Sequence, residues 1–509
     1  MLAPVSNAIS QRWPTWVLLM ATIAGTLLLG PWAAEGTMKL RVALLAAFLF
    51  IVYAAVTGQV RELLLIGWAG SLTYNRQYFL FAPLTGDQGT QGPYVIVSDI
   101  FLAGLLLEWV YRVVVRREVL PAKGPPFWLW YAPLAAISVF SLLVADRPDW
   151  AAYELLRVLR LLLIFAYVRR CFGIREWWLA LIAGGLAMVG QAAIGAKEVI
   201  TGRSGLLGAD IATGIGQYEG AFDQESFYGM VRATGTMNHP PNLACYLMSF
   251  IPVFAGLAFT ARNTLLRLGA LGIAAAGLGG LVCTMSRLPI ALASAELTVV
   301  LLALVVVRDV PVRQALGILL VSIALVIAVA IPYRDKIIDR MTRDFTASVD
   351  QRAEGNRIAL AMIEERPWLG VGLNNSKVHM LKHAPDLEWA FTNEEFLVTV
   401  MHSRSIAAMG NGFLFIAVEL GVVGMIAYAI FLAGSLVIGI RAVAKTRGAV
   451  RGACLGILVG IVAVLLEQTI DFSVWVDPQL YTNALLLGAL AIAPALSSQL
   501  ERPAFANKQ

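Results

Sequence analysis

Two arginines stand at the edges of apolar segments and have the chemistry of a phosphate-binding site. Arg232 opens the string Arg232-Ala233-Thr234-Gly235, and Arg287 follows Ser286 at the start of an apolar run. A guanidinium stays charged and can donate two parallel hydrogen bonds to phosphate oxygens. An arginine bordering a hydrocarbon segment is costly unless it faces a cavity or an anion, or extends its head to the interface. A diphosphate clamp and a snorkelling arginine are therefore both open interpretations.

Histidines offer candidate proton acceptors. His402 and Arg404 follow Met401 closely and precede an apolar segment, so they could supply a base and a further phosphate contact. His239 precedes two prolines at an expected helix start, where a polar residue can satisfy unpaired amides. The sequence therefore predicts a structural cap at His239 in preference to catalysis.

A metal or nucleotide site is not indicated. His379 and His383 have the i, i+4 spacing of some zinc sites, but no His-Glu pattern accompanies them. The sequence has no glycine-rich nucleotide motif, no Asp-x-Asp pair for a metal-bound nucleotide sugar, and no internal repeat typical of a secondary transporter. We therefore expect no cofactor and no nucleotide-activated donor.

The elements that must position these residues are membrane helices. Of the 509 residues, 59% are hydrophobic and only 14% are charged, which is too little polar surface for a soluble globule of this size. The apolar residues form blocks of about 20, the length of a membrane-crossing helix. This predicts an all-α, polytopic transmembrane bundle of about 12–14 spans. The expected spans are 15–33, 41–57, 62–82, 94–114, 127–145, 151–168, 176–197, 241–260, 264–284, 286–307, 314–332, 411–440, 452–468 and 479–496. The third, with its polar end at Tyr74-Asn75-Arg76-Gln77, is the weakest and could instead be re-entrant.

The distribution of Lys and Arg over the short loops predicts the orientation. One alternating set of loops is basic, which places those loops and both termini in the cytoplasm. The net charge of +6 is mostly this orientation signal, so no nucleic-acid partner is implied.

Two long segments fall on the opposite side. They divide the chain into a bundle at 1–332 with an outer loop at 201–240, a large extracytoplasmic loop at 333–410, and C-terminal helices at 411–509. Residues 350–366 of the large loop predict an amphipathic helix, because an apolar face opposes a polar one. The apolar residues are Ile358, Ala359, Met362 and Ile363, and the polar ones Glu354, Arg357 and Glu364. Pro367 ends this helix, and the Gly- and Asn-containing string up to Asn375 predicts a tight, shaped loop.

Several strings together resemble the O-antigen ligase and polymerase family over roughly residues 225–425. In order, they are Arg232-x-x-Gly235, Asn238-His239-Pro240-Pro241-Asn242, Ser286-Arg287, Arg357, Pro367-Trp368-Leu369-Gly370-Val371-Gly372, Gly410-Asn411-Gly412-Phe413-Leu414, and Glu419-Leu420-Gly421 with Gly424. The resemblance implies that Arg232 and Arg287 hold the diphosphate of a lipid-linked donor and that Arg357 shapes or charges the outer site. His239 and Asn411 are expected to support it. The implied chemistry is metal-independent, inverting glycosyl transfer.

This sequence departs from the family pattern at one position. Ligases of the family usually carry a His-Asn pair whose histidine is the proposed base, and here that position is Gly410, followed by Asn411. Either His402 takes over, or Glu394 or Glu395 does, or the diphosphate clamp alone suffices. The departure weakens the ligase assignment more than the polymerase one.

The resulting prediction is a polysaccharide polymerase in the bacterial inner membrane, with its active site facing the periplasm. Its donor would be an undecaprenyl-diphosphate-linked glycan, and its acceptor a sugar hydroxyl of another lipid-linked repeat unit. Membrane lipid and a chain-length regulator are the further expected partners. A ligase acting on lipid A core or protein, a flippase of lipid-linked glycans, and a non-catalytic scaffold are the alternatives.

Overall fold

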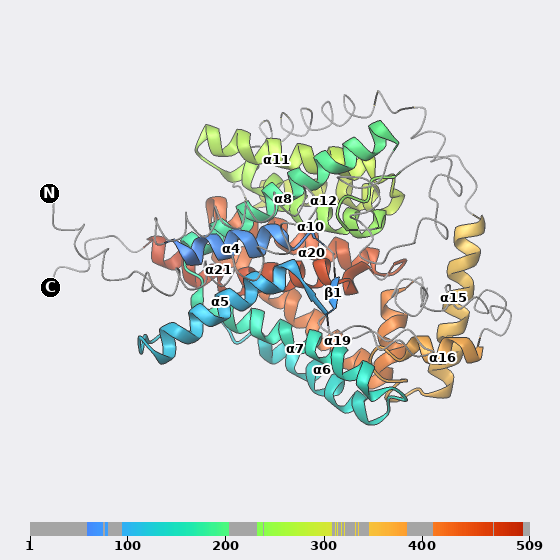
Figure 1. Cartoon of the computed structure of the whole chain (residues 1–509). Coiled ribbons are helices and arrows are strands. Elements are labelled where there is room, and N and C mark those ends of the chain that lie inside the picture. The colour runs from blue at the N-terminus through green and yellow to red at the C-terminus, as the bar shows by residue number, and fades with distance from the viewer. Residues whose placement is uncertain are drawn as a thin grey trace, which may run out of the picture.

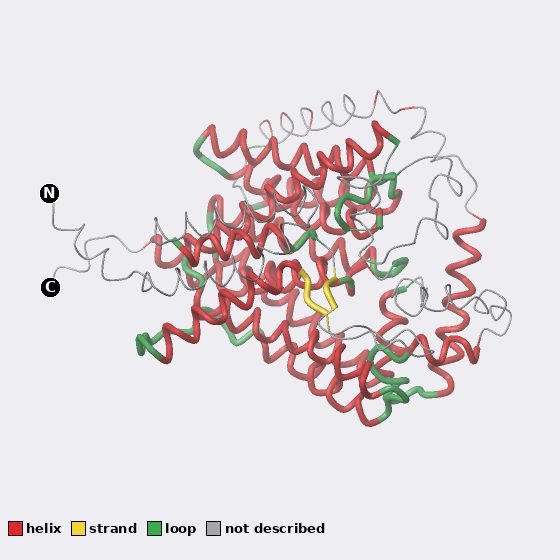
Figure 2. Tube along the Cα trace, in the orientation of Figure 1, coloured by secondary structure: helices red, strands yellow, loops and turns green. Residues whose placement is uncertain are grey.

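The computed structural model is mostly helical over the residues that it describes (Figures 1 and 2). These are 59–74, 77–79, 94–202, 232–237, 239–307, 346–383, 411–471 and 473–501, with six isolated residues between 311 and 334. The one strand pairing in this part of the chain is short, between β1 (Gln77–Phe79) and β2 (Tyr94–Ile96). The predicted all-α fold class is therefore confirmed.

The helices follow the predicted apolar blocks closely. The first group comprises α4 (Val60–Ser71), α5 (Val97–Val114), α6 (Trp128–Phe140) with the 3-10 turn Ser141–Leu143, α7 (Pro148–Cys171) and α8 (Ile174–Thr201). The second comprises α10 (Pro240–Thr260), α11 (Thr264–Cys283), α12 (Arg287–Val306), α15 (Thr346–Glu365) and α16 (Ser376–His383). The last comprises α19 (Gly412–Lys445), α20 (Gly448–Glu467), the 3-10 turn Ser473–Trp475 and α21 (Asp477–Glu501).

Seven of the described helices are long and apolar enough to cross a membrane: α8, α10, α11, α12, α19, α20 and α21. The expected spans 15–33 and 41–57 lie outside the described residues, as does nearly all of 314–332. The total of 12–14 spans and the orientation of the chain therefore stay predictions.

The expected third span, 62–82, is wrong in its second half. Helix α4 ends at Ser71, and the chain then enters β1, where Tyr78 pairs with Val95 of β2. Thr73, Tyr74 and the Gln-Tyr-Phe of β1 include β-branched and aromatic residues that fit a strand better than a helix end.

Helix α10 forms the centre of the bundle and is buried over nearly all of its length. Glycines let it approach α20 closely: a Cβ atom on Gly256 would lie 2.1 Å from the carbonyl oxygen of Gly452, and one on Gly456 would lie 2.2 Å from that of Pro252. Small residues at such contacts are the usual means of close helix packing in membranes. The backbones of α10 and α20 are therefore in direct contact in the middle of the bundle.

Helices α15 and α16 pack beside one end of the bundle, on the right of Figure 1. As predicted, the apolar face of α15 is buried: Ile358, Ala359 and Met362 are 3%, 0% and 1% exposed. They form a small second core with Val371, Met380, Phe415 and Val418. The loop segment is thus docked on the start of α19.

Candidate functional site

A short strap, residues 232–237, crosses the end of the bundle that also carries α15. The buried carboxylate of Glu198, in the last turns of α8, accepts hydrogen bonds from the amides of Thr234 (2.7 Å) and Gly235 (2.9 Å) and from the Thr234 hydroxyl (3.1 Å). Gln191, on the same helix, accepts from the amide of Thr236 (2.9 Å) and donates to its hydroxyl (2.7 Å). Two side chains of α8 therefore fix the strap.

Arg232 joins this strap to the turn between α11 and α12. Its Nε donates to the carbonyl oxygen of Thr284 (3.0 Å) and its Nη2 to the hydroxyl of Ser286 (3.0 Å). The side chain is only 8% exposed. Because two of its donors point at the turn, the guanidinium is held in one orientation.

Arg287 comes directly after this turn, as the first residue of α12. Met285 makes the turn tight, since its backbone adopts φ of +50°, which a non-glycine residue rarely does. Arg287 is half-buried. Arg232 and Arg287 therefore meet at Ser286, although 54 residues of sequence separate Arg232 from that serine. The role of the two arginines in binding a diphosphate stays a prediction.

His239 occupies the N-cap position of α10, but its side chain makes no capping hydrogen bond. The predicted cap role is therefore wrong, because Pro240 and Pro241 already remove two of the amides that would need an acceptor. The imidazole is accessible, yet enough protein surrounds it that desolvation lowers its pKa. Arg232 and Arg352 also lower this pKa, and Asp471 opposes them. His239 is thus close to charges from three other parts of the chain.

Asn411 has a structural role at the start of α19. Its side-chain oxygen accepts from the amides of Phe413 (2.8 Å) and Leu414 (3.2 Å), which is an N-cap. The next amide, that of Gly412, donates to the carbonyl oxygens of Gln468 (2.8 Å) and Asp471 (3.2 Å). The turn after α20 therefore packs against the first residue of α19.

The string Pro367–Leu373 pairs with a break in α19. The amides of Val371 and Gly372 donate to the carbonyl oxygens of Val418 (2.9 Å) and Glu419 (3.0 Å), and the amide of Val422 donates to that of Pro367 (2.8 Å). The break is at Gly421, with φ of +65° and ψ of −168°. The predicted shaped loop is confirmed: Gly370, Gly372 and Asn374 all have positive φ.

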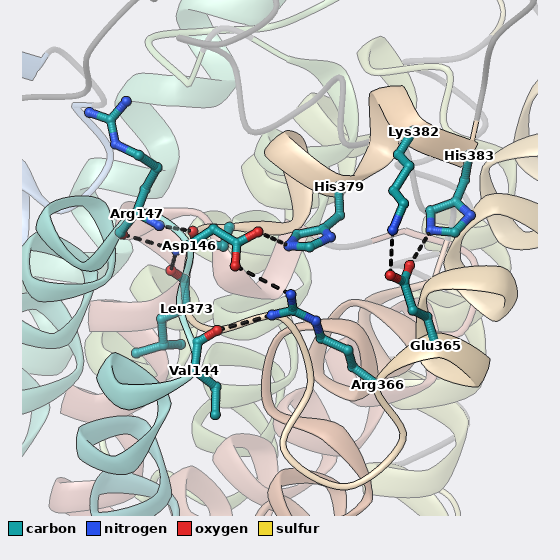
Figure 3. Close-up of polar contacts among 10 residues, drawn as sticks. Val144, Asp146, Arg147, Glu365, Arg366, Leu373, His379, Lys382 and His383 are labelled. Carbon is teal, nitrogen blue, oxygen red and sulfur yellow. Dashed lines mark hydrogen bonds and ion pairs between the residues drawn. The ribbon is translucent and has the colours of Figure 1, made fainter.

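A cluster of charged side chains anchors α16 and the end of α15 (Figure 3). The carboxylate of Asp146, between α6 and α7, lies 2.8 Å from Nε2 of His379 and 3.3 Å from Nη2 of Arg366. Nη1 of Arg366 also donates to the carbonyl oxygen of Val144 (3.0 Å). His383 instead faces Glu365, at 2.9 Å. The two histidines with i, i+4 spacing therefore bind separate carboxylates.

The other predicted site residues are Arg357, His402 and Arg404. Arg357 is exposed on α15, whereas its neighbours Ile358 and Ala359 are buried. His402 and Arg404 lie outside the described residues. Sequence reasoning missed Glu198 and Asp471, since each is a single carboxylate with no motif around it.

Comparisons with known proteins agree with the motifs. A family model described as O-antigen ligase matches residues 272–429, a region that runs from within α11 through α12, α15 and α16 to the first half of α19. A search of curated proteins found no matching relative. Together with the apolar helices, the match indicates a multi-pass bacterial membrane protein with a glycosyltransferase-like activity. The predicted resemblance is thus confirmed over residues 272–429, which match the family model described as O-antigen ligase.

Proposed function

We propose that the protein is a polysaccharide polymerase that takes its glycan from a lipid diphosphate. The donor would be an undecaprenyl-diphosphate-linked glycan, and the acceptor a sugar hydroxyl of a second lipid-linked repeat unit. The observation that carries this proposal is the pairing of Arg232 with Ser286, directly before Arg287. One guanidinium bound to the tight turn and a second one directly after it, at a helix start, suit the two phosphates of a lipid diphosphate.

The catalytic effect would be electrostatic. Negative charge grows on the diphosphate as the bond to the anomeric carbon breaks, and fixed positive charges stabilise that transition state more than the ground state. Arg232 is well suited to this role because its orientation is set by the bonds to Thr284 and Ser286 before any donor arrives. The basic short loops support a site on the periplasmic side, with both termini in the cytoplasm.

A ligase is the second candidate, because the matching family model is described as an O-antigen ligase. It would use the same donor and the same clamp, but it would place the glycan on lipid A core or a protein. Its product is a capped acceptor with unchanged glycan length. A flippase of lipid-linked glycans would leave the donor chemically unchanged.

The test is transfer by the purified full-length protein in nanodiscs, supplied with a lipid-diphosphate-linked repeat unit from the host. Longer lipid-linked chains are expected for the wild type, and none for Arg232→Ala or Arg287→Ala. Arg262→Ala is the matched control, since Arg262 is exposed in the α10–α11 connection. A thermal melt of each variant separates loss of the clamp from loss of the fold. Wild-type amounts of polymer from either clamp variant would contradict the proposal.

A further inference from the structure

The turn after α20 and the start of α10 lie at the same end of the bundle, because the two helices pack antiparallel, with Gly256 against Gly452 and Gly456 against Pro252. Asp471 follows α20, and its carbonyl oxygen accepts the amide of Gly412, next to the segment where the family usually has its base. His239 precedes α10 and is exposed, with no capping hydrogen bond to occupy its side chain. Arg232 belongs to the strap that leads into α10, so this arginine of the clamp and the imidazole of His239 lie on one short stretch of chain.

We infer that His239 is the general base of the glycosyl transfer and that Asp471 is its positioning residue. This inference rests on the proposed function and supplies the group that Gly410 cannot. Here the proposed base is the residue before α10, whereas the histidine of the family would stand shortly before α19. The Gly412–Asp471 contact joins the start of α19 to the turn after α20, and the antiparallel packing of α20 on α10 brings that turn to the start of α10.

The step balances without any other reactant. The acceptor hydroxyl oxygen forms a bond to the anomeric carbon as the hydroxyl proton moves to a ring nitrogen of His239. The bond between that carbon and the donor phosphate oxygen breaks, and its electron pair leaves with the lipid diphosphate. Arg232 and Arg287 face the departing charge, and the imidazolium then returns its proton to water.

The surroundings of His239 suit a base. Desolvation and the positive charges of Arg232 and Arg352 lower its pKa, so at neutral pH the ring is uncharged and free to accept a proton. Asp471 acts in the opposite direction and stabilises the imidazolium once it has formed. Glu467, one turn earlier, is a poorer candidate because it is only 3% exposed and cannot reach an acceptor.

The experiment is a single-turnover assay in nanodiscs with the lipid-diphosphate-linked repeat unit, repeated across pH 5–8. We expect His239→Gln to lose roughly 10²–10⁴-fold in rate, the usual contribution of general base catalysis. Binding of the donor should stay at the wild-type level, because the arginines are retained. Arg262→Gln is the control, since Arg262 is exposed beyond the opposite end of α10, and its rate should not change.

Two further variants test the assignment even if His239→Gln were to fold poorly. Asp471→Asn removes a charge that raises the pKa of His239, so the acid limb of the rate profile should move to lower pH. Arg352→Gln removes a charge that lowers this pKa, so the same limb should move to higher pH. A merely structural role for either residue would lower the rate without these opposite shifts.

The outcomes separate the two proposals. An active wild type with an equally active His239→Gln would overturn the base assignment and leave the polymerase in place. Loss of activity in Asp471→Asn alone, with His239→Gln active, would make Asp471 the direct base and also overturn it. A wild type that transfers glycan to no acceptor would overturn the proposed function, and the base assignment with it.

Discussion

Gly370 and Gly421 face each other across the contact between the Pro367–Leu373 loop and α19, and neither position has room for a Cβ atom. A Cβ atom on Gly370 would lie 2.4 Å from the carbonyl oxygen of Val418, and one on Gly421 would lie 2.3 Å from that of Trp368. Both residues also have positive φ, +67° and +65°. The two glycines therefore allow the loop and the broken helix to exchange backbone hydrogen bonds.

We predict that Gly370→Ala and Gly421→Ala each undock α15 and α16 from α19. The backbone strain of such a residue alone is about 1–3 kcal/mol, and the clash with main-chain atoms cannot be relieved by a side-chain rotation. Both variants should melt at lower temperature and lose transfer activity. Gly272→Ala in α11 is the control, since a Cβ atom there meets nothing within 4 Å. Equal melting of all three variants would show that the contact is unimportant.

Glu198 should affect binding of the donor through Arg232, although Glu198 lies on α8 and Arg232 lies on the strap. Glu198→Ala leaves the amides of Thr234 and Gly235 buried without their acceptor, at a cost of about 1–3 kcal/mol for each unsatisfied group. The strap would then shift and Arg232 with it. We expect a raised KM for the lipid-linked donor in a transfer assay.

A double variant checks this coupling. If Glu198 acts only by placing Arg232, then Glu198→Ala adds little to the loss already caused by Arg232→Ala. Fully additive losses in the two changes would instead mean that Glu198 contributes on its own, and the positioning role would have to be given up.

Much of the fold could be predicted from the sequence because apolar block length and period report burial directly. This holds for α8, α10 and α12, and for the amphipathic α15 with its buried Ile358 and Met362. Arg287 was expected at the start of a span and is the first residue of α12. Each of these features depends on neighbours in sequence.

The features that sequence reasoning missed depend on contacts between distant residues. Glu198 lies within an apolar helix pattern, and only the strap, 36 residues later, gives it a partner. The break at Gly421 interrupts an otherwise continuous apolar run, so periodicity predicts one helix across it. His239 was expected to cap α10 because it stands before two prolines at a helix start. The sequence does not show whether such a side chain bonds to the helix amides, and here it does not.

A buried ion pair between α7 and α21 should be important for stability. Nη1 of Arg157 lies 2.8 Å from a carboxylate oxygen of Asp477, and Nη2 lies 2.5 Å from one of Glu154. The side chains are 5%, 2% and 8% exposed. Removing Asp477 breaks a buried, charge-assisted hydrogen bond, which typically contributes about 1.5–3 kcal/mol, while Glu154 stays beside Arg157.

We therefore predict that Asp477→Ala lowers the melting temperature in detergent strongly. Asp149→Ala, which breaks the surface pair with Arg147, should change it little, since exposed pairs contribute about 0–1 kcal/mol. Asp149 is 46% exposed in that pair. Similar melting of the two variants would mean that water reaches Arg157 when Asp477 is absent.

Glu365 makes the packing of α16 on α15 sensitive to acid. Hydrogen bonds from Lys382 and His383 lower the pKa of this carboxyl to about 2, well below its ordinary value of 4.5. A carboxyl whose pKa is lower in the folded state stabilises that state above the unfolded-state pKa, and the stabilisation is lost as the pH falls towards the folded-state value. Docking of α16 should therefore be complete above about pH 4.5 and weaken between there and about pH 2.

The measurement is hydrogen exchange of the 376–383 amides in nanodiscs as the pH is lowered, corrected for the intrinsic exchange rate. Glu365→Gln cannot ionise, so at neutral pH these amides should already exchange faster than in the wild type. Glu364→Gln is the matched control, because Glu364 is the exposed neighbour on the same helix. If Glu365→Gln exchanged like the wild type at neutral pH, the docking of α16 would depend on Asp146, His379 and Arg366 alone.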